Sequence, residues 1–340
     1  MDDELEIREL RASDVEALIA CVRRCYGESY ADPSFYDAAA LRAQLASGRL
    51  VSRVAVAPDG RVVGHLGTRR ARPGEPVAET VGGIVEPEQR GRGLLRRIGG
   101  EMNRVYSELR IAGVRLFATT AHSRTQNLIA AAGGVVTGVL LAHIPAETEY
   151  HGIEPARGAS RFACVVCYQA LTTAPSLRVH LPDEVAEIAG SVYADLALAR
   201  EFVRAPAGGI APVAGSIARN PQRGSRTLRL GALAEDGEPR FASLDEALRD
   251  ADEAVVYADV PLASRAAPGV VAALHERGFF FGALLPGSTR SETLRLQRLS
   301  PSVELREPIA VAAPQGQRVL AQVLGGWRAA KTSRATVRPG

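Results

Sequence analysis

The chain has 340 residues, of which 46% are hydrophobic and 23% are charged, and it carries a formal net charge of +3. This length suits two domains, and the composition is typical of a globular protein that buries a real core. The small net charge does not indicate a nucleic-acid-binding protein. No apolar run is long enough to span a bilayer, and the acidic start is unlike a signal peptide, so we expect a cytoplasmic protein with no membrane partner.

The first half predicts a mixture of strands and helices. Ser-Asp-Val-Glu at residues 13–16 forms a capping box, which indicates the start of a helix. Apolar residues from Leu94 to Leu109 recur at spacings of four and three, which predicts an amphipathic helix. In chain order, the expected elements are a strand at 5–10, helices beginning at 13 and 36, a hairpin of strands at 54–56 and 62–65, a strand at 77–85, a helix from 94, a strand at 114–118, a short helix at 123–132, and strands at 135–144 and 161–171.

The second half is expected to begin near residue 172. Clusters of Gly, Pro, Ser and Arg in it predict irregular segments and turns. In chain order, the expected elements are a strand at 177–181, a helix from Pro182, a long irregular segment at 204–225, a hairpin of strands at 226–233 and 239–242, and a disordered tail at 331–340.

An internal repeat relates the two halves. In the first half, the strand that contains Leu116 is followed by Ser-Arg at 123–124, a helix, a glycine and two strands. In the second half, the strand at 255–257 is followed by Ser-Arg at 264–265 and the same series of elements. The repeat predicts that the second half copies the architecture of the first.

A glycine-rich turn at residues 90–95 joins the strand at 77–85 to the helix that follows it. Such a turn gathers backbone N–H groups without intrahelical acceptors at the positive end of a helix dipole, which suits a phosphate or pyrophosphate. Arg90 and Arg92 add positive charge. The sequence therefore predicts a site for a phosphorylated ligand here, and the second half has no counterpart of this turn.

The element order and the placement of this turn resemble the GCN5-related N-acetyltransferase (GNAT) family. The pyrophosphate loop of that family is matched at four positions, Val85, Pro87, Arg90 and Gly93. The chain departs from the family at Leu95, where Gly or Ala is usual. This departure is compatible with the site because the backbone N–H, not the side chain, is expected to touch phosphate.

The resemblance implies an α/β fold of two tandem GNAT-like domains, each a mixed, mostly antiparallel sheet flanked by helices. Residues 1–171 would form the acyl-CoA-binding domain, and residues 172–330 a degenerate second copy. The implied activity is that of an acyl-CoA-dependent N-acyltransferase. Acetyl-CoA or another acyl-CoA would be the co-substrate, and a primary amine of a small molecule would be the acceptor.

The resemblance also assigns residues to the co-substrate. The pyrophosphate would lie on the backbone N–H groups of the turn, the end of the strand at Val85 would pair with the pantetheine arm, and Ser123 falls where the family often places a residue that touches this arm. The residues assigned to binding are Val85, Arg90, Gly91, Arg92, Gly93, Leu94, Leu95 and Ser123.

Acyl transfer to an amine needs a base for the ammonium proton, a donor that polarises the thioester carbonyl, and an acid for the leaving thiolate. Glu79 is our candidate base, because it shares strand parity with Val81, Gly83 and Val85 and because the family often carries a glutamate on this strand. The alternative for Glu79 is a structural ion pair with an arginine.

The usual acid of the family, a tyrosine on the fourth helix, is missing, since no tyrosine lies between Tyr106 and Tyr150. His122 is our candidate catalytic residue in its place, and Ser123 is the alternative acid. A histidine at the end of a strand that is merely hydrogen-bonded is the other interpretation of His122. His65, on the third strand, is a weaker candidate that would face the acceptor cleft.

Three further groups have structural alternatives. Cys21, Cys25, Cys164 and Cys167 could form a zinc site, but strand positions three apart point to opposite faces, so we expect no metal and free, buried thiols. Phe279–Phe281 could line an acceptor pocket, with a core strand as the favoured interpretation. Arg223, Arg226 and Arg229 could bind an acidic substrate, with solvated surface charge as the favoured interpretation.

Two rival functions stay open. Some tandem members of this fold transfer an aminoacyl group from tRNA, which would demand a broad basic surface that this sequence does not display. The missing tyrosine would also fit a non-catalytic acyl-CoA sensor. Neither the acceptor nor the oligomeric state follows from the sequence.

Overall fold

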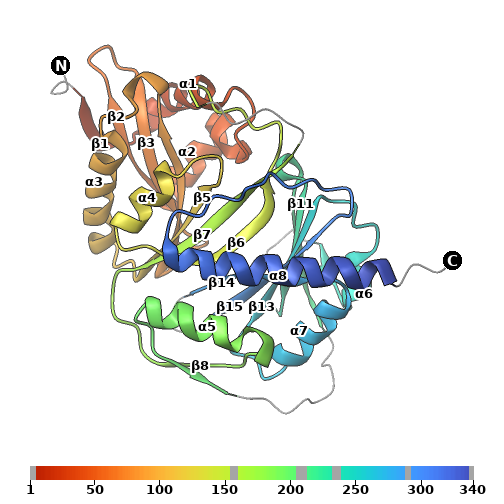
Figure 1. Cartoon of the computed structure of the whole chain (residues 1–340). Coiled ribbons are helices and arrows are strands. Elements are labelled where there is room, and N and C mark those ends of the chain that lie inside the picture. The colour runs from red at the N-terminus through yellow and green to blue at the C-terminus, as the bar shows by residue number, and fades with distance from the viewer. Residues whose placement is uncertain (1–4, 154–159, 204–212, 232–238, 288–291, 337–340) are drawn as a thin grey trace. The chain divides into compact units, whose positions relative to one another are not determined.

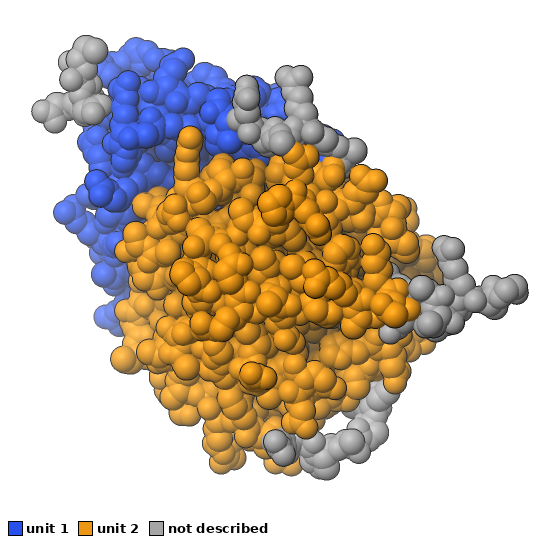
Figure 2. Space-filling model, viewed as in Figure 1, with its two compact units in different colours: residues 1–116, 146–159 blue, residues 117–145, 160–340 orange. Residues whose placement is uncertain are grey.

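Figure 1 shows the computed structural model, which describes residues 5–153, 160–203, 213–231, 239–287 and 292–336. Contacts within the chain divide it into two compact units, drawn in different colours in Figure 2. The first unit comprises Met1–Leu116 and Ala146–Ala159, and the second comprises Phe117–Pro145 and Ser160–Gly340. None of the described helices is both long and apolar enough to cross a membrane.

The first unit contains a mixed sheet. The strands β1 (Glu6–Glu9), β2 (Leu50–Val56), β3 (Val62–Arg69) and β4 (Val77–Val85) are antiparallel neighbours in that order. The two units divide within β5 (Gly113–Thr119), which pairs in parallel with β4. The hairpin predicted at the start of the chain is therefore confirmed as β2 and β3.

Helices of the first unit cover both faces of this sheet. On one face, α1 (Val15–Tyr26) and α2 (Ala38–Ala46) share an apolar core with Val54 of β2. On the other face, α3 (Leu94–Glu108) packs against the neighbouring residue, Ala55. Successive side chains of a strand point to opposite faces, so one strand contributes to two cores. We call these the α1–α2 face and the α3 face.

The second unit contains a larger mixed sheet, with the strand order β7-β6-β14-β15-β13-β11-β10-β12. Neighbours are antiparallel except β11 and β13, which are parallel. A separate parallel pair is formed by β8 (Leu177–Val179) and β9 (Arg200–Phe202). The strands of the large sheet are β6 (Val135–Ile144), β7 (Phe162–Ala170), β10 (Gly215–Asn220), β11 (Ser225–Leu230), β12 (Arg240–Phe241), β13 (Val255–Pro261), β14 (Phe280–Leu285) and β15 (Thr293–Leu299).

Helices flank this sheet as well, so the expected mixed α/β class is confirmed. The helix α8 contacts β6 and β14, α5 contacts β6, and α7 contacts β13. The closeness of α8 is visible at Gly326, where an added Cβ would lie 3.0 Å from Cβ of Phe280. The helices of the second unit are α4 (Arg124–Ala131), α5 (Asp183–Asp195), α6 (Leu244–Leu248), α7 (Ala267–Glu276) and α8 (Pro314–Thr336).

Two expectations for the second half are wrong. Part of the segment 204–225, expected to be irregular, is the strand β10, which pairs with β11 along its whole length. The predicted second hairpin does not form, because β10 lies between β11 and β12 in the sheet. The chain from 232 to 238, where that hairpin was to turn, lies outside the described residues.

The C-terminal tail also differs from expectation. The helix α8 continues through Thr336, so residues 331–336, expected to be disordered, are helical. The segment contains good helix formers such as Lys331 and Ala335 and has neither glycine nor proline before Pro339. Residues 337–340 lie outside the described part of the chain.

Two strand pairings of the first half have counterparts of the same direction in the second half. The strands β14 and β15 pair antiparallel, as β6 and β7 do, and β11 pairs in parallel with β13, as β4 does with β5. Where α3 follows β4, the described residues between β11 and β13 contain the short helix α6. The domain boundary expected after residue 171, and the tandem arrangement itself, remain predictions.

Candidate functional site

The glycine-rich turn joins β4 to α3 in the first unit. Pro87–Gln89 form a short 3-10 turn, and Gly91 and Gly93 follow with φ angles of 78° and 71°. Both angles lie in the left-handed region, which glycine adopts without side-chain strain. Gly93 is the N-cap of α3, and no side chain caps the helix. The first N–H groups of α3 therefore lack intrahelical acceptors at the positive end of the helix dipole.

Exposed arginines surround this turn. Arg92 lies within it, and Arg96 and Arg97 lie in the first turn of α3. Leu94, by contrast, is buried, and Leu95 is half-buried. Sequence reasoning missed Arg96 and Arg97, although their place beside the N-cap follows from the predicted start of the helix. The turn therefore combines backbone donors with a locally positive surface.

Arg90 braces the backbone in this structure. Its Nε donates a hydrogen bond of 2.9 Å to the carbonyl oxygen of Val85, and its Nη1 donates to the carbonyl oxygen of His151. The guanidinium thus ties the end of β4 to the segment before residue 154. That Arg90 also contributes charge to a bound anion remains a prediction.

A buried carboxylate precedes the turn. The side chain of Glu86 is 3% exposed and accepts a hydrogen bond from Nε of Arg24. Nη1 of Arg61 lies 3.9 Å from its other oxygen. Two arginines therefore surround one carboxylate, so Glu86 leaves no uncompensated negative charge beside the turn. No pattern in the sequence distinguished Glu86 from a surface glutamate.

The strands β4 and β5 stay paired over only part of their length. The parallel register runs from Val77 opposite Gly113 to Glu79 opposite Arg115 and, among the described residues, includes no later part of β4. One edge of β4 therefore lacks a β5 partner from Thr80 to its end. Extended backbone of this kind can pair with the amide groups of an extended ligand.

On its other side, β4 contains a β-bulge. The register with β3 shifts between the pairs Gly67–Val81 and His65–Ile84. Between these pairs β4 has one more residue than β3. The bulge consists of Gly82 and Gly83, neither of which has a register partner on β3. Such a bulge re-aims the backbone locally and often lies beside a functional site.

His65 holds this bulge from β3. Its Nδ1 lies 2.6 Å from the carbonyl oxygen of Gly82, and its Nε2 lies 3.0 Å from Oγ of Ser52. Since a carbonyl oxygen only accepts hydrogen bonds, Nδ1 carries the proton and Nε2 accepts from the hydroxyl group. Burial lowers the pKa of His65 to about 4, so the ring is neutral at neutral pH. The expectation that His65 faces an acceptor cleft is wrong, because its side chain is fully buried.

The bulge requires glycine at position 82. The φ angle of Gly82 is 60°, and an added Cβ would lie 2.6 Å from Cζ of Phe35 and 2.7 Å from Nδ1 of His65. The ring of Phe35 is itself fully buried and meets the imidazole edge-on, with the ring centroids 5.5 Å apart. Space and backbone conformation therefore both exclude a side chain there.

The bulge also corrects the expected orientation of Glu79. Beyond the bulge the strand parity is reversed, so Glu79 shares a face with Val81 and Ile84, not with Gly83 and Val85. Glu79 is half-buried, and the register places Arg69 of β3 and Arg115 of β5 opposite it. Its role as a base remains a prediction, beside the ion-pair alternative.

The remaining two predicted residues, His122 and Ser123, belong to the second unit. His122 follows β5 and is partly exposed, and Ser123 is the exposed N-cap of α4, without a side-chain cap hydrogen bond. Their roles as acid and as a contact to the pantetheine arm remain predictions.

Several other residues considered in the sequence are buried in the core of one of the two units. Phe279–Phe281 are buried, in agreement with the core interpretation. The expectation of solvated surface charge is wrong for Arg226, which is buried, pairs with Glu253 at 2.8 Å and donates to backbone carbonyls. All four cysteines are buried, as expected.

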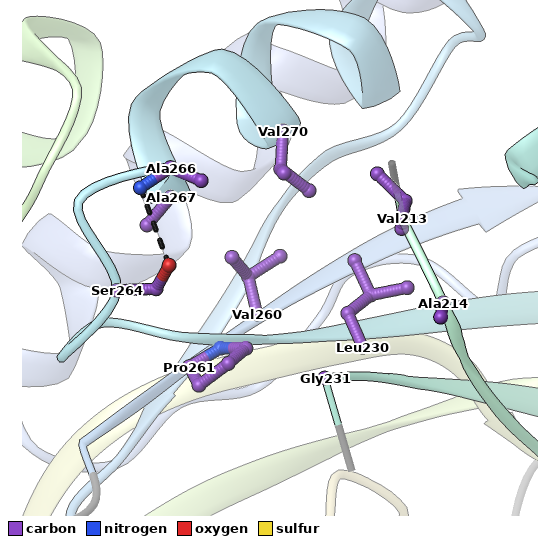
Figure 3. A pocket seen from close by; sticks show the side chains of 10 residues that line it. All are labelled: Val213, Ala214, Leu230, Gly231, Val260, Pro261, Ser264, Ala266, Ala267 and Val270. Atoms are coloured by element: carbon purple, nitrogen blue, oxygen red, sulfur yellow. Dashed lines mark hydrogen bonds between the residues drawn. The ribbon is translucent and has the colours of Figure 1, made fainter. Parts of the chain in front are cut away.

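The second unit also contains an apolar pocket of about 210 Å3 at the carboxyl ends of the parallel pair β11 and β13 (Figure 3). Leu230, Val260 and Val270 of α7 point into it (Figure 3). At its edge, the hydroxyl oxygen of Ser264 accepts a hydrogen bond from the N–H of Ala266 at 3.2 Å. Among the described residues, no charged side chain lines the pocket. Its described lining therefore suits apolar groups.

No family model matches the chain, and no curated protein matches it. Solved structures are similar to about half of it. A phosphinothricin acetyltransferase from Sinorhizobium meliloti, in complex with acetyl-CoA, is 19% identical over 49% of this chain and 89% of that chain, with a TM-score of 0.39. A GCN5-related N-acetyltransferase from Kribbella flavida is 22% identical over 50% of this chain and 100% of that chain, with a TM-score of 0.38. Mutant forms of the spermidine/spermine N-acetyltransferase from Vibrio cholerae are 14% identical over 50% of this chain and 95% of that chain, with a TM-score of 0.39.

Proposed function

We propose that the protein is an acyl-CoA-dependent N-acyltransferase that transfers an acyl group, acetyl in the first instance, to a primary amine of a small molecule. One observation carries this proposal. In the first unit, a β4 strand with a bulge and a free edge runs directly into an uncapped helix N-terminus with exposed arginines. The resemblance of the same residues to the GNAT pyrophosphate loop supports it.

The turn would hold the diphosphate of the co-substrate. Gly91 and Gly93 carry no side chains, so phosphate oxygens can approach the backbone N–H groups of the turn and of Leu94 and Leu95. Arg92 and Arg96 supply exposed positive charge around them. Diphosphate binding at such a site combines oriented N–H donors with charge that salt screens.

The edge of β4 would hold the pantetheine arm. From Thr80 to Val85 this edge has no β5 partner among the described residues, so its backbone groups suit the amides of an extended ligand. The arm would then run from the turn toward the bulge at Gly82, which places the thioester beside the bulge.

In the proposed reaction the amine first loses a proton, and its nitrogen lone pair attacks the thioester carbon. The carbon–sulfur bond then breaks, and the thiolate takes up a proton. Glu79 is the proposed acceptor of the first proton, and His122 the proposed donor of the last, with Ser123 as a contact to the arm. The attacking nitrogen loses its second proton as the carbon–sulfur bond breaks, and this proton restores His122, while Glu79 passes the first proton to water. The products are therefore the amide, the thiol of coenzyme A and one released proton.

The proposal is tested by incubating the protein with several acyl-CoAs and a pooled library of primary amines, followed by mass spectrometry. We expect an N-acylated product and an equal amount of free thiol. Binding of acyl-CoA without any product would instead favour the sensor function. Neither binding nor product, with a salt-sensitive shift of tRNA in a gel, would favour the aminoacyl transferase alternative.

A further inference from the structure

A side chain, not a neighbouring strand, supplies the hydrogen-bond donor to the carbonyl oxygen of the Gly82–Gly83 peptide. The carbonyl oxygen of Gly82 accepts its hydrogen bond from Nδ1 of His65, which lies on the α1–α2 face together with Phe35. In a regular strand this carbonyl would instead lie in the plane of the sheet and accept from a neighbouring strand. The peptide therefore points out of the sheet.

The orientation of this carbonyl fixes the orientation of the next N–H group. A trans peptide is planar, and its C=O and N–H point in opposite directions. With the oxygen of Gly82 directed to the α1–α2 face, the N–H of Gly83 is directed to the α3 face. An added Cβ at Gly83 would lie 3.5 Å from Cδ1 of Leu66, which packs with Leu94 of α3, so Gly83 borders the α3 face. Gly83 is exposed there.

We propose that His65 is a positioning residue: it clamps the Gly82–Gly83 peptide so that the N–H of Gly83 polarises the thioester carbonyl of a bound acyl-CoA. This inference rests on the proposed function. A fixed donor aimed at the carbonyl oxygen stabilises the negative charge that develops there as the amine attacks, and it needs no reorganisation at that moment.

Ser52 and Phe35 complete the clamp. The hydroxyl group of Ser52 donates to Nε2 and so keeps the proton on Nδ1, where the Gly82 carbonyl needs it. The ring of Phe35 closes the remaining space beside Gly82. The peptide is thereby prevented from rotating back into the plane of the sheet, which would turn the Gly83 N–H away from the ligand.

Two substitutions distinguish the hydrogen bond that His65 donates from the packing of its ring. His65→Phe keeps an aromatic ring against Phe35 and removes the donor, whereas His65→Asn restores an N–H near the position of Nδ1. The probe is acetyl-CoA with a 13C-labelled carbonyl, observed by isotope-edited infrared spectroscopy. The affinity for coenzyme A, which has no thioester carbonyl, is measured as a control for binding at the glycine-rich turn.

In the wild type and in His65→Asn we expect the carbonyl band of bound acetyl-CoA to lie at lower frequency than in solution. In His65→Phe it should return toward the solution frequency, while the affinity for coenzyme A stays within about twofold. An unchanged band in His65→Phe would overturn the inference and leave the proposed function intact. A wild type that binds neither compound would overturn both.

A measurement on the wild type alone tests the inference even if a variant does not fold. A 15N spectrum of the histidine side chains should show His65 protonated at Nδ1 and unprotonated at Nε2 at neutral pH. Protonation at Nε2 would overturn the inference, because Nδ1 could not then donate to Gly82. The Ser52→Ala variant should shift this tautomer balance toward Nε2.

Discussion

Nδ1 of His65 lies 2.6 Å from the carbonyl oxygen of Gly82, a residue on the next strand of the sheet. This contact fastens β3 to the bulge of β4, a few residues before β4 enters the glycine-rich turn. The strongest predictions concern this contact, the turn and the glutamate that precedes the bulge.

The first prediction concerns the need for glycine at the bulge. Gly82→Ala should lower the free energy of unfolding by about 3 kcal/mol, because its φ angle of 60° and the 2.6 Å approach to Phe35 leave no room for a methyl group. Urea denaturation followed by circular dichroism measures this loss. The matched control is Gly83→Ala, whose Cβ would meet Leu66 at an ordinary 3.5 Å. Equal effects of the two substitutions would contradict the steric argument.

The second prediction concerns the acid stability of the protein. The folded-state pKa of His65 is about 4, below that of an exposed histidine, so the unfolded chain binds more protons between pH 6.5 and pH 4. The contribution of His65 to stability should therefore be complete above pH 6.5 and be lost as the pH falls toward 4, by about 3 kcal/mol. The neighbouring cation is Arg69, which acts in the same direction as burial.

Denaturation curves at several pH values between 4 and 7 check this prediction. In His65→Phe the stability should vary less across the same interval, because no group there titrates. A wild type and variant with parallel pH profiles would show that His65 is not the titrating group.

The third prediction concerns the glycine-rich turn. Gly93→Glu should weaken acetyl-CoA binding by at least about tenfold, which corresponds to about 1.4 kcal/mol, because it places negative charge and bulk at the N-cap of α3. Isothermal titration calorimetry measures the affinity. The control is Gly100→Glu, on the exposed surface of the same helix, where an added Cβ meets nothing within 4 Å. If Gly93→Glu binds as the wild type does, the ligand is not at this turn.

The fourth prediction concerns the arginines that the sequence alone did not single out. Replacing Arg96 and Arg97 together by glutamine should weaken acetyl-CoA binding several-fold at low salt and less at high salt, since exposed charges are screened. Replacing Arg104, which lies farther along α3 and contacts Glu101, should have no such effect. A salt dependence that is the same in both variants would argue against a phosphate contact.

The fifth prediction concerns Glu79. Glu79→Gln should lower the turnover of acyl transfer by about 100-fold and leave the affinity for acetyl-CoA unchanged, as expected for a residue that handles a proton. The pH–rate profile measures the difference, and the loss of its acidic limb would identify the base. Should Glu79→Gln lower the thermal stability with no change in turnover, the ion-pair alternative would be correct.

Local features were accessible from the sequence. The apolar stripe of α3 and the glycines of the turn each act over a few residues, and the elements they predict are found. The helix expected from residue 13 begins at Val15, but the predicted capping box is wrong, because the N-cap is Asp14 and no side chain caps the helix. The hairpin of β2 and β3 likewise follows from one short turn.

Features that depend on partners distant in the chain were not accessible. The orientation of Glu79 was inferred from strict alternation along β4, and the bulge at Gly82 breaks that alternation. The bulge depends on His65 and Phe35, which come from another strand and from the segment before α2. In the same way, β10 is a strand because β11 pairs with it, although its surroundings are rich in glycine and proline.

The close fit at Gly82 restricts which amino-acid substitutions this protein can accept at three positions during evolution. A larger residue at position 82 becomes possible only if Phe35 and His65 both retreat, and neither can shrink without leaving a hole beside the bulge. The three positions should therefore vary as a set among related chains, each lineage keeping all three or replacing all three. A pairwise count of substitutions at these positions would show whether the clamp is inherited as one unit.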